Sequence, residues 1–283
     1  MATRTDVEQF LEKLRSDLDR QLMDIPTLPD VSVQALFIVH DDNSTIADLV
    51  NLISRDTALA SRLVRQANSP AYRGLHRCST IHAAVTRLGM ERVRQVVVTH
   101  SMKDVFQTGN EAIRERMEQL WDHSLEVAIL CYLLARRQRH LDPDVALLAG
   151  LVHDIGAVPI LRRAEKIPVI YEDPRAVQAA IDAAHVAMGR AMLKSWNFDP
   201  EIVRAVGEHE KVRQDPGDHE PVSYTDILQA ANIESYGGTG HRLAAIDRRE
   251  VPAFRRLTGD PERLTLDWDT DEAGLKHVNQ IFE

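Results

Sequence analysis

Residues 150–156 read GLVHDIG, and this stretch decides the fold. It closes an apolar run that begins at Ala146, so His153 and Asp154 follow the end of a predicted buried helix. Adjacent helical residues point about 100° apart, so both side chains reach one ion only if it lies beside the helix end. Imidazole and carboxylate together suit Zn²⁺, Fe, Mn²⁺ or Ni²⁺, and such ions activate water and polarise phosphoryl oxygens. A His-Asp dipeptide is common by itself, and its context gives it meaning.

Three further histidines lie on apolar helix faces on either side of this stretch: His123, His185 and His209. A single histidine on such a face is most often a satisfied core residue. A buried neutral imidazole needs partners for both ring nitrogens. Four histidines on four neighbouring helices find these partners together in a shared polar pocket. We therefore expect the four helices to converge on one site beside Asp154.

The composition of the 283-residue chain favours close-packed helices. Hydrophobic residues make up 44% and aromatic residues only 5%, so aliphatic side chains and alanine must build the core. The net charge of −9 argues against nucleic-acid binding, which needs lysine and arginine on the phosphates. The N-terminus has no apolar signal region, and no window approaches 18 uninterrupted apolar residues, so we expect no membrane span. We expect an all-α cytoplasmic protein with reduced cysteines and no membrane contact.

Helical periodicity and its interruptions predict four parts. They are an N-terminal helix (1–25), an N-terminal helical subdomain (26–108), a second helical subdomain (109–240) and a tail (241–283). Pro26 and Pro29 end the first helix, because proline disfavours helix in the residue before it. Strand signals are confined to short candidates at 168–170 and 264–266, and a weak last helix is expected at 271–282.

Residues 112–240 resemble the HD superfamily of metal-dependent phosphohydrolases. GLVHDIG is similar to its central motif, and His123 in WDHS matches its first ligand histidine. His185 begins a run that ends at Trp196 and matches the additional histidine of the HD-GYP branch, and His209 in EHE matches the first histidine of that branch's HH pair. The resemblance implies a set of metal ligands, active or vestigial: His123, His153, Asp154, His185 and His209.

The first half resembles the HDOD family specifically. Leu28-Pro29 resembles its opening, DLVNLISRDTALASRLVRQANSPAY (48–72) resembles its helical pair ending in Asn-Ser, and STIHAAVTRLGMERVRQVV (79–97) resembles its next helix. Together the two halves cover 26–240. The resemblance implies a multi-helix architecture, with an N-terminal helical subdomain packed on an HD-like helical subdomain, and a role in bacterial signal transduction.

The chain departs from the HD pattern at two ligand positions. Asn232 stands where the final ligand aspartate is expected, and Glu210 stands at the second histidine of the HH pair. Asp226 precedes Asn232 by six residues and so points to a different helix face. A neutral amide is a weaker ligand than a carboxylate, and hydrolysis also needs an open coordination position for water. The resemblance therefore implies a retained fold with lost catalysis, with Asn232, Glu210 and Trp196 as candidate binding residues.

Three functions stay open at this point. The preferred one is a non-catalytic regulatory module that binds a partner protein, or a small ligand such as a nucleotide or phosphate, through the degenerate pocket. The second is a metal-dependent phosphohydrolase, either a phosphodiesterase or a nucleotidase, in which Glu210 supplies the missing carboxylate. The third is a hydrogen-bonded core network that binds no ligand.

Overall fold

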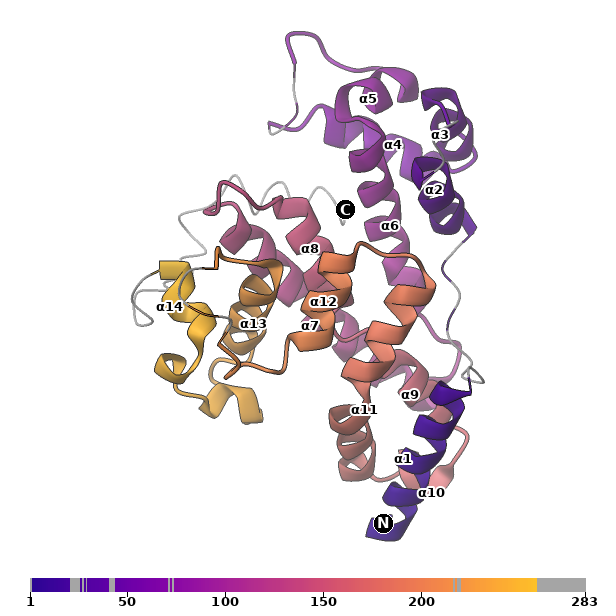
Figure 1. Cartoon of the computed structure of the whole chain (residues 1–283). Coiled ribbons are helices and arrows are strands. Elements are labelled where there is room, and N and C mark those ends of the chain that lie inside the picture. Colours follow the sequence, from indigo (N-terminus) through magenta and orange to yellow (C-terminus); the bar gives the residue numbers. More distant parts are fainter. Residues whose placement is uncertain are drawn as a thin grey trace. The chain divides into compact units, whose positions relative to one another are not determined.

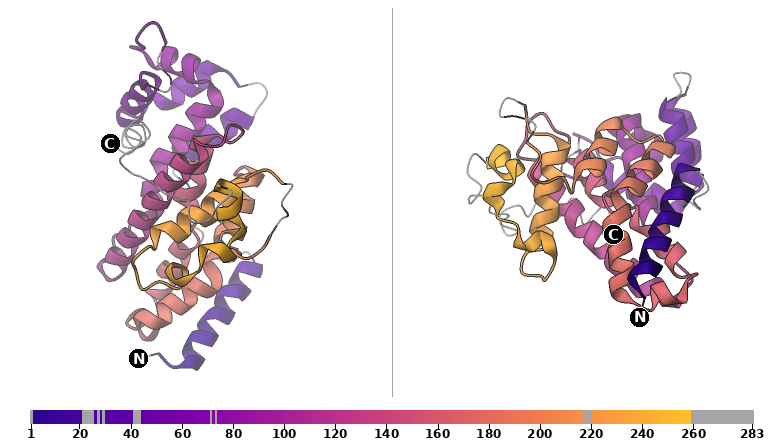
Figure 2. Two further views of the ribbon diagram at one scale, coloured as in Figure 1. Left: turned by 90° about the vertical axis from the view of Figure 1, so that its left-hand side faces the viewer. Right: turned by 60° about the horizontal axis from the view of Figure 1, so that its bottom comes forward.

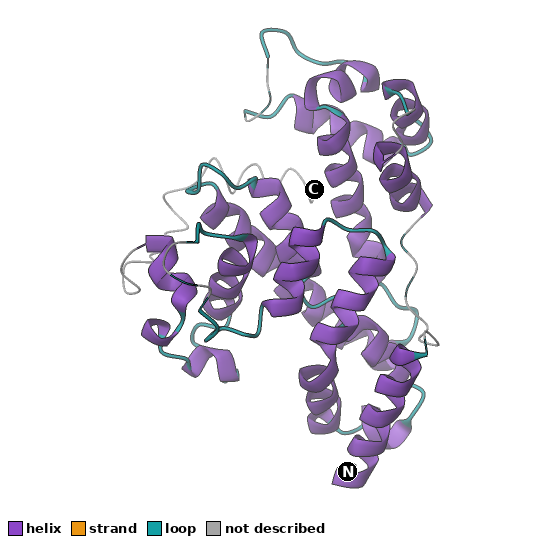
Figure 3. Ribbon diagram, in the orientation of Figure 1, coloured by secondary structure: helices purple, strands orange, loops and turns teal. Residues whose placement is uncertain are grey.

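All the regular secondary structure is helical in the part of the chain that its computed structural model describes (Figure 3). This part is residues 2–258 without 21–25, 27, 29, 41–43, 71, 73, 216, 218 and 219, and without the side chains of 18, 19, 33, 36, 37, 39 and 40. No strand occurs in it, as the composition predicts. The strand candidate at 168–170 is wrong, because Pro168–Tyr171 forms helix α10 with Pro168 at its first position. The expectations at 264–266 and 271–282 lie outside the described residues.

The chain divides into two compact units, whose helices are labelled in Figure 1. The first unit contains the described residues of 1–27 and 106–265, and the second contains those of 28–105. Helix α1 (Arg4–Asp19) therefore belongs with the second half of the chain, where it packs along α11 (Pro174–Ser195) (Figure 2). An ion pair of 2.9 Å also joins Asp17 of this helix to Arg163 on α9 (Ala157–Ala164).

The second unit contains five helices: α2 (Asp30–His40), α3 (Ile46–Ile53), α4 (Thr57–Ala67), α5 (Ile81–Leu88) and α6 (Met90–Phe106). Their apolar stripes meet in one core that includes Leu49, Leu63 and Val85. Asn68, in the Asn-Ser sequence after α4, pairs its amide with the backbone N–H and C=O of Cys78, at 2.8 Å each. This pairing closes the loop between α4 and α5, which explains a polar residue at that helix end.

The first unit contains the remaining elements: α7 (Glu111–Ala135), α8 (Pro143–Val152), α9 (Ala157–Ala164), α10, α11, α12 (Pro200–Glu208), α13 (Tyr224–Ser235), the 3₁₀ turns η1 (Arg242–Ala245) and η2 (Arg248–Glu250), and α14 (Pro252–Thr258). Helices α8, α11 and α12 all begin with Asp-Pro, in which the carboxylate accepts from the second helical N–H group. Each such cap contributes about 0.5–2 kcal/mol, and the proline fits because its position needs no N–H donor.

Helices α7 and α8 pack closely because Gly150 has no side chain. A Cβ atom there would lie 2.6 Å from the Cα of Ala128 on α7. Every residue of α8 from Ala146 to Val152 is buried. Among the described residues, Pro143–Ala164 is the one segment long and apolar enough to cross a membrane, and 89% of its most apolar window is buried inside the structure. This extent of burial is typical of helices in a protein core.

Candidate metal site

Asp154 lies in the turn between α8 and α9, at the centre of the histidine cluster. The preceding residue, His153, caps the C-terminal end of α8. The turn is fixed against α11, because a Cβ atom on Gly156 would lie 2.0 Å from the carbonyl oxygen of His185. The close approach of this turn to α11 therefore brings the His-Asp pair beside the His185 ring.

Three of the four histidine rings are held by their own helices. The Nδ1 atoms of His153, His185 and His209 each lie 2.7 Å from a backbone carbonyl oxygen three or four residues earlier. A carbonyl oxygen only accepts, so each Nδ1 carries the proton and donates it. In the neutral ring the Nε2 atom then bears a lone pair. Such second hydrogen bonds are how proteins orient metal-ligating histidines.

These lone pairs converge on the Asp154 carboxylate. The Nε2 atoms of His185 and His209 lie 3.3 and 3.4 Å from its Oδ1 atom, and that of His153 lies 3.4 Å from its Oδ2 atom. His123 completes the cluster from α7, with its Nε2 atom 3.8 Å from Oδ2. The structure thus brings all five predicted ligands together, in two groups of three that share Asp154.

The second group, Asp154, His185 and His209, has the spacing of ligands around one ion. Its three ligand-to-ligand distances are 3.3, 3.4 and 3.4 Å. Ligands bound at about 2.0–2.2 Å from a tetrahedral ion lie about 3.3–3.6 Å from one another. Without a cation, the lone pairs of His185 and His209 would face each other and a carboxylate. The donor set therefore fits a transition-metal ion.

The first group, His123, His153 and Asp154, leaves buried polar atoms without partners. Among the described residues, the Nε2 atoms of His123 and His153 and the Oδ1 atom of the neighbouring Asn232 have no hydrogen-bond partner. Asn232, on α13, lies beside His123, and the contact between their side chains opposes the lowering of the pKa of His123. A buried unsatisfied acceptor costs about 1–3 kcal/mol. Coordination of a cation by the Asn232 carbonyl oxygen would offset this cost with a neutral ligand.

The electrostatics of the cluster keep its groups in the forms that ligate metal. Burial, followed by the neighbouring His153, lowers the pKa of His123 from 6.5 to about 4. His123 is therefore neutral at pH 7. Burial opposes ionisation of Asp154, but positive charge and hydrogen-bond donation at the His153, His209 and His185 positions outweigh it and hold the pKa of Asp154 well below its usual range. A bound cation supplies the same positive charge when these rings present lone pairs. Asp154 is therefore a carboxylate.

A pocket of about 520 Å³ opens onto the first group. Its lining includes His123 and Asp154 of the cluster, the apolar Leu120 and Ile181, and the charged residues Glu115 and Arg116. Arg116 precedes His123 by two helical turns on α7, so it lies about 10 Å along the helix axis. The pocket offers space for a small molecule whose polar end meets the cluster.

The other candidate binding residues take different places. The Oε1 atom of Glu210 lies 3.7 Å from the Nε2 atom of His185, at the edge of the second group. Trp196 packs against Phe198 and lies eleven residues beyond His185 on α11, roughly 16 Å along the axis. Asp226 caps α13 through Ser223 and pairs with Arg256 at 3.1 Å. It is thus occupied elsewhere, and does not replace the carboxylate missing at Asn232.

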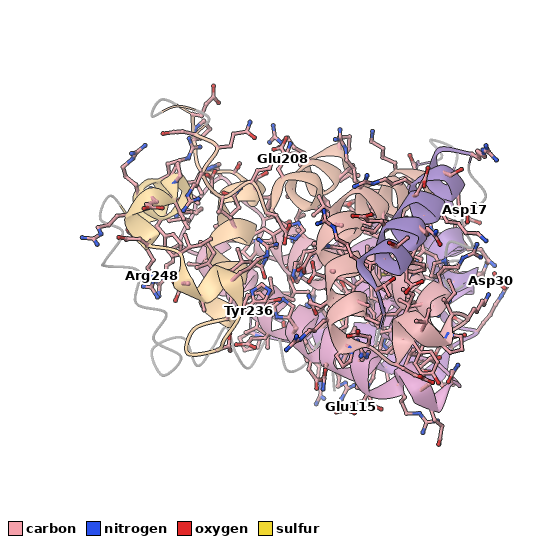
Figure 4. The ribbon with its side chains drawn as sticks, turned by 90° about the horizontal axis from the view of Figure 1, so that it is seen from below. Asp17, Asp30, Glu115, Glu208, Tyr236 and Arg248 are labelled. Carbon is pink, nitrogen blue, oxygen red and sulfur yellow. The ribbon has the colours of Figure 1, made fainter. Side chains whose placement is uncertain are left out.

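Residues after α13 form a second layer of side chains around the histidine cluster, which the sequence did not predict. The ring of Tyr236, labelled in Figure 4, stacks on His123 with centroids 4.6 Å apart and on His241 at 3.7 Å. Arg242 forms an ion pair with Glu210. These residues fall at or beyond the end of the last strong helical pattern. The glycines at 237, 238 and 240 were the one available signal, since they allow the chain to turn back.

Comparison with known proteins gives consistent matches. Residues 25–212 match the model of the HDOD domain family. The structure superposes on a candidate metal-dependent phosphohydrolase from Shewanella amazonensis SB2B with a TM-score of 0.77, covering 98% of each chain at 28% identity.

Two relatives share only part of their length with this chain. An uncharacterized protein of Treponema pallidum (strain Nichols) is 25% identical over 247 residues, which are 82% of this chain and 47% of the relative. Ribonuclease Y of Desulfotalea psychrophila is 33% identical over 126 residues, which are 44% of this chain and 19% of the enzyme. The chain therefore spans about half of the first relative and a fifth of the second.

Proposed function

The chain belongs to the HDOD domain family, and we propose that it is a bacterial cytoplasmic regulatory domain whose His/Asp pocket binds transition-metal ions without hydrolysing phosphate esters. One observation carries the metal-binding part. The Nδ1 atoms of His153, His185 and His209 donate to backbone carbonyls, so three Nε2 lone pairs point at the Asp154 carboxylate. These three lone pairs and the carboxylate repel one another unless a cation lies between them.

The non-catalytic part follows from Asn232. A bound divalent ion supplies Lewis acidity and lowers the pKa of a bound water. In this chain the first group meets the pocket with a neutral amide where the HD resemblance places a carboxylate. Asp154 is then the one carboxylate of the first group, and it is shared with the second group, so the first group holds less negative charge against a divalent ion. The pocket would bind an anionic small ligand, such as a nucleotide or phosphate. A partner protein would then recognise the ligand-bound form of the domain.

Metal analysis tests the first part of the proposal. The purified chain is stripped with a chelator, reloaded separately with Zn²⁺, Mn²⁺, Fe²⁺ and Ni²⁺, and analysed by elemental mass spectrometry. We expect at least one ion per chain in the wild type and loss of it in Asp154→Asn. His82→Gln, an exposed histidine on α5, is the matched control. A chain that retains no ion after reloading would refute metal binding.

Phosphohydrolase activity is the second candidate function, because the pocket of about 520 Å³ leads directly to His123 and Asp154. A screen of phosphodiester and nucleotide substrates with each reloaded metal separates the two functions. Turnover at ordinary enzyme rates, about 1–10³ s⁻¹, that disappears in Asp154→Asn would establish the enzyme. The regulatory proposal expects no such turnover in a sample that contains bound metal.

A further inference from the structure

We infer that Glu210 is a fourth ligand of the second group and that Arg242 competes with the ion for it. This inference rests on the proposed function, because it requires that the group binds an ion. Glu210 directly follows His209 at the end of α12, and its side chain is 21% exposed. Its Oε1 atom lies 3.7 Å from the Nε2 atom of His185, close to the spacing of ligands around one ion.

The second group needs such a ligand. Asp154, His185 and His209 form one triangular face, which leaves a corner of the tetrahedron open. A carboxylate at that corner adds a second negative charge, so it neutralises a divalent ion more completely than Asp154 alone. The first group has only the neutral Asn232 for this purpose. Glu210 therefore makes the second group the tighter of the two.

The oxygen atom of Glu210 that approaches His185 already has an ion-pair partner. Oε1 also accepts from the Nη2 atom of Arg242, in an ion pair. A guanidinium and a divalent ion repel each other strongly when both contact one oxygen atom. Coordination of an ion by Oε1 therefore has to weaken the contact with Arg242. Removing the positive charge of Arg242 has the reverse effect and frees Glu210 for the ion.

The position of Arg242 is fixed by its neighbours. Three glycines, including Gly238 with φ of +76°, let the chain turn back after Tyr236. His241 then stacks on Tyr236 at 3.7 Å, and its Nδ1 atom accepts from the backbone N–H of Leu243 at 3.3 Å. Leu243 is buried. Arg242 is held between these two anchored residues, so its contact with Glu210 belongs to the folded structure.

Cobalt titration of the full chain tests this inference. Binding of Co²⁺ is measured by calorimetry and by the visible absorption of the bound ion, which reports coordination. We expect E210Q to weaken one of two binding events by roughly tenfold or more and to change the spectrum. R242Q should strengthen the same event. In the double variant E210Q/R242Q the gain from R242Q should disappear, because Arg242 acts through Glu210.

R248Q is the matched control, since Arg248 lies in the same C-terminal segment and pairs with Glu234 at 2.6 Å instead. It changes the charge equally and should leave Co²⁺ binding as in the wild type. Unchanged affinity and spectrum in E210Q, or weaker binding in R242Q, would overturn the inference while a Co²⁺-binding wild type keeps the proposed function. A wild type that binds no Co²⁺ overturns both.

Discussion

The Nε2 atoms of His185 and His209 face each other at 3.4 Å, although the Nδ1–H group of each ring is committed to its own helix. When both rings are neutral, neither Nε2 atom has a proton to offer the other. In that form two lone pairs face each other, held together by helix packing, and a cation between them stabilises the contact. This arrangement makes direct predictions about metal binding.

The first prediction concerns His209→Gln. The variant keeps a polar side chain but loses a ligand of the second group, so we expect its affinity for Zn²⁺ or Co²⁺ to fall by more than about 100-fold, the upper range for changes in the surroundings of ligands. Calorimetric titration of the reloaded protein measures the change. His82→Gln should bind as the wild type does. Equal affinity in both variants would show that His209 is no ligand.

Asn232→Asp should strengthen metal binding by the first group. The new carboxylate would replace a neutral oxygen that is buried and lacks a hydrogen-bond partner among the described residues. We expect at least tenfold tighter binding of one ion, since charge matters most in a buried site. In the metal-free protein the same change should lower stability, because it buries another charge. Chemical denaturation measures the stability of the variant with and without Zn²⁺. We expect higher stability than the wild type with Zn²⁺ and lower stability without it, and a variant that is destabilised under both conditions contradicts the prediction.

Part of this site could be predicted from sequence because it depends on local helical patterns. The apolar periodicity around His123, His153, His185 and His209 indicates which helix face each histidine occupies, and burial then brings the rings together. Glu210 is a candidate because of its place beside His209, but its contact with Arg242 could not be predicted in this way. Their contact joins the end of α12 to a segment after α13 across 32 residues, and neither residue lies on a periodic apolar face. Side-chain periodicity carries no information on such a contact.

The N-terminal helix shows the same limit. Its amphipathic pattern predicts a helix, and α1 is a helix, but the pattern does not say which surface receives its apolar face. The chain returns α1 to the unit that begins at Phe106. The contact between Arg163 and Asp17 spans 146 residues. Long-range placement of this kind depends on the shape of the finished unit, which periodicity does not describe.

The pH dependence of stability follows from His123. Its pKa is about 4 in the folded protein and 6.5 for the unperturbed side chain, so between these values the unfolded state binds more protons. The free energy of unfolding therefore rises with pH in this window, and falls by about 2–3 kcal/mol from pH 6.5 to 4.5. Urea denaturation of metal-free protein at several pH values measures the slope. His123→Gln should flatten it, and a slope that persists unchanged would rule out this origin.

Gly156→Ala should destabilise the fold and impair the site together. Its Cβ atom would lie 2.0 Å from the carbonyl oxygen of His185, so the turn that carries Asp154 has to move away from α11. Overpacking of this kind costs about 1–3 kcal/mol or more. Gly109→Ala is the matched control, because nothing lies within 4 Å of its added Cβ atom. Thermal melting compares the two, and equal melting temperatures would show that the turn adjusts freely.

Asp154 is the one residue common to both three-ligand groups. Its two oxygen atoms are divided between them, Oδ1 toward His185 and His209 and Oδ2 toward His153 and His123. The two groups are therefore coupled through a single carboxylate. An ion held by one group would draw electron density from the oxygen that faces the other group, so that oxygen would be a less basic ligand for a second ion. Binding at the two groups should therefore be linked, with the second ion held more weakly than the first.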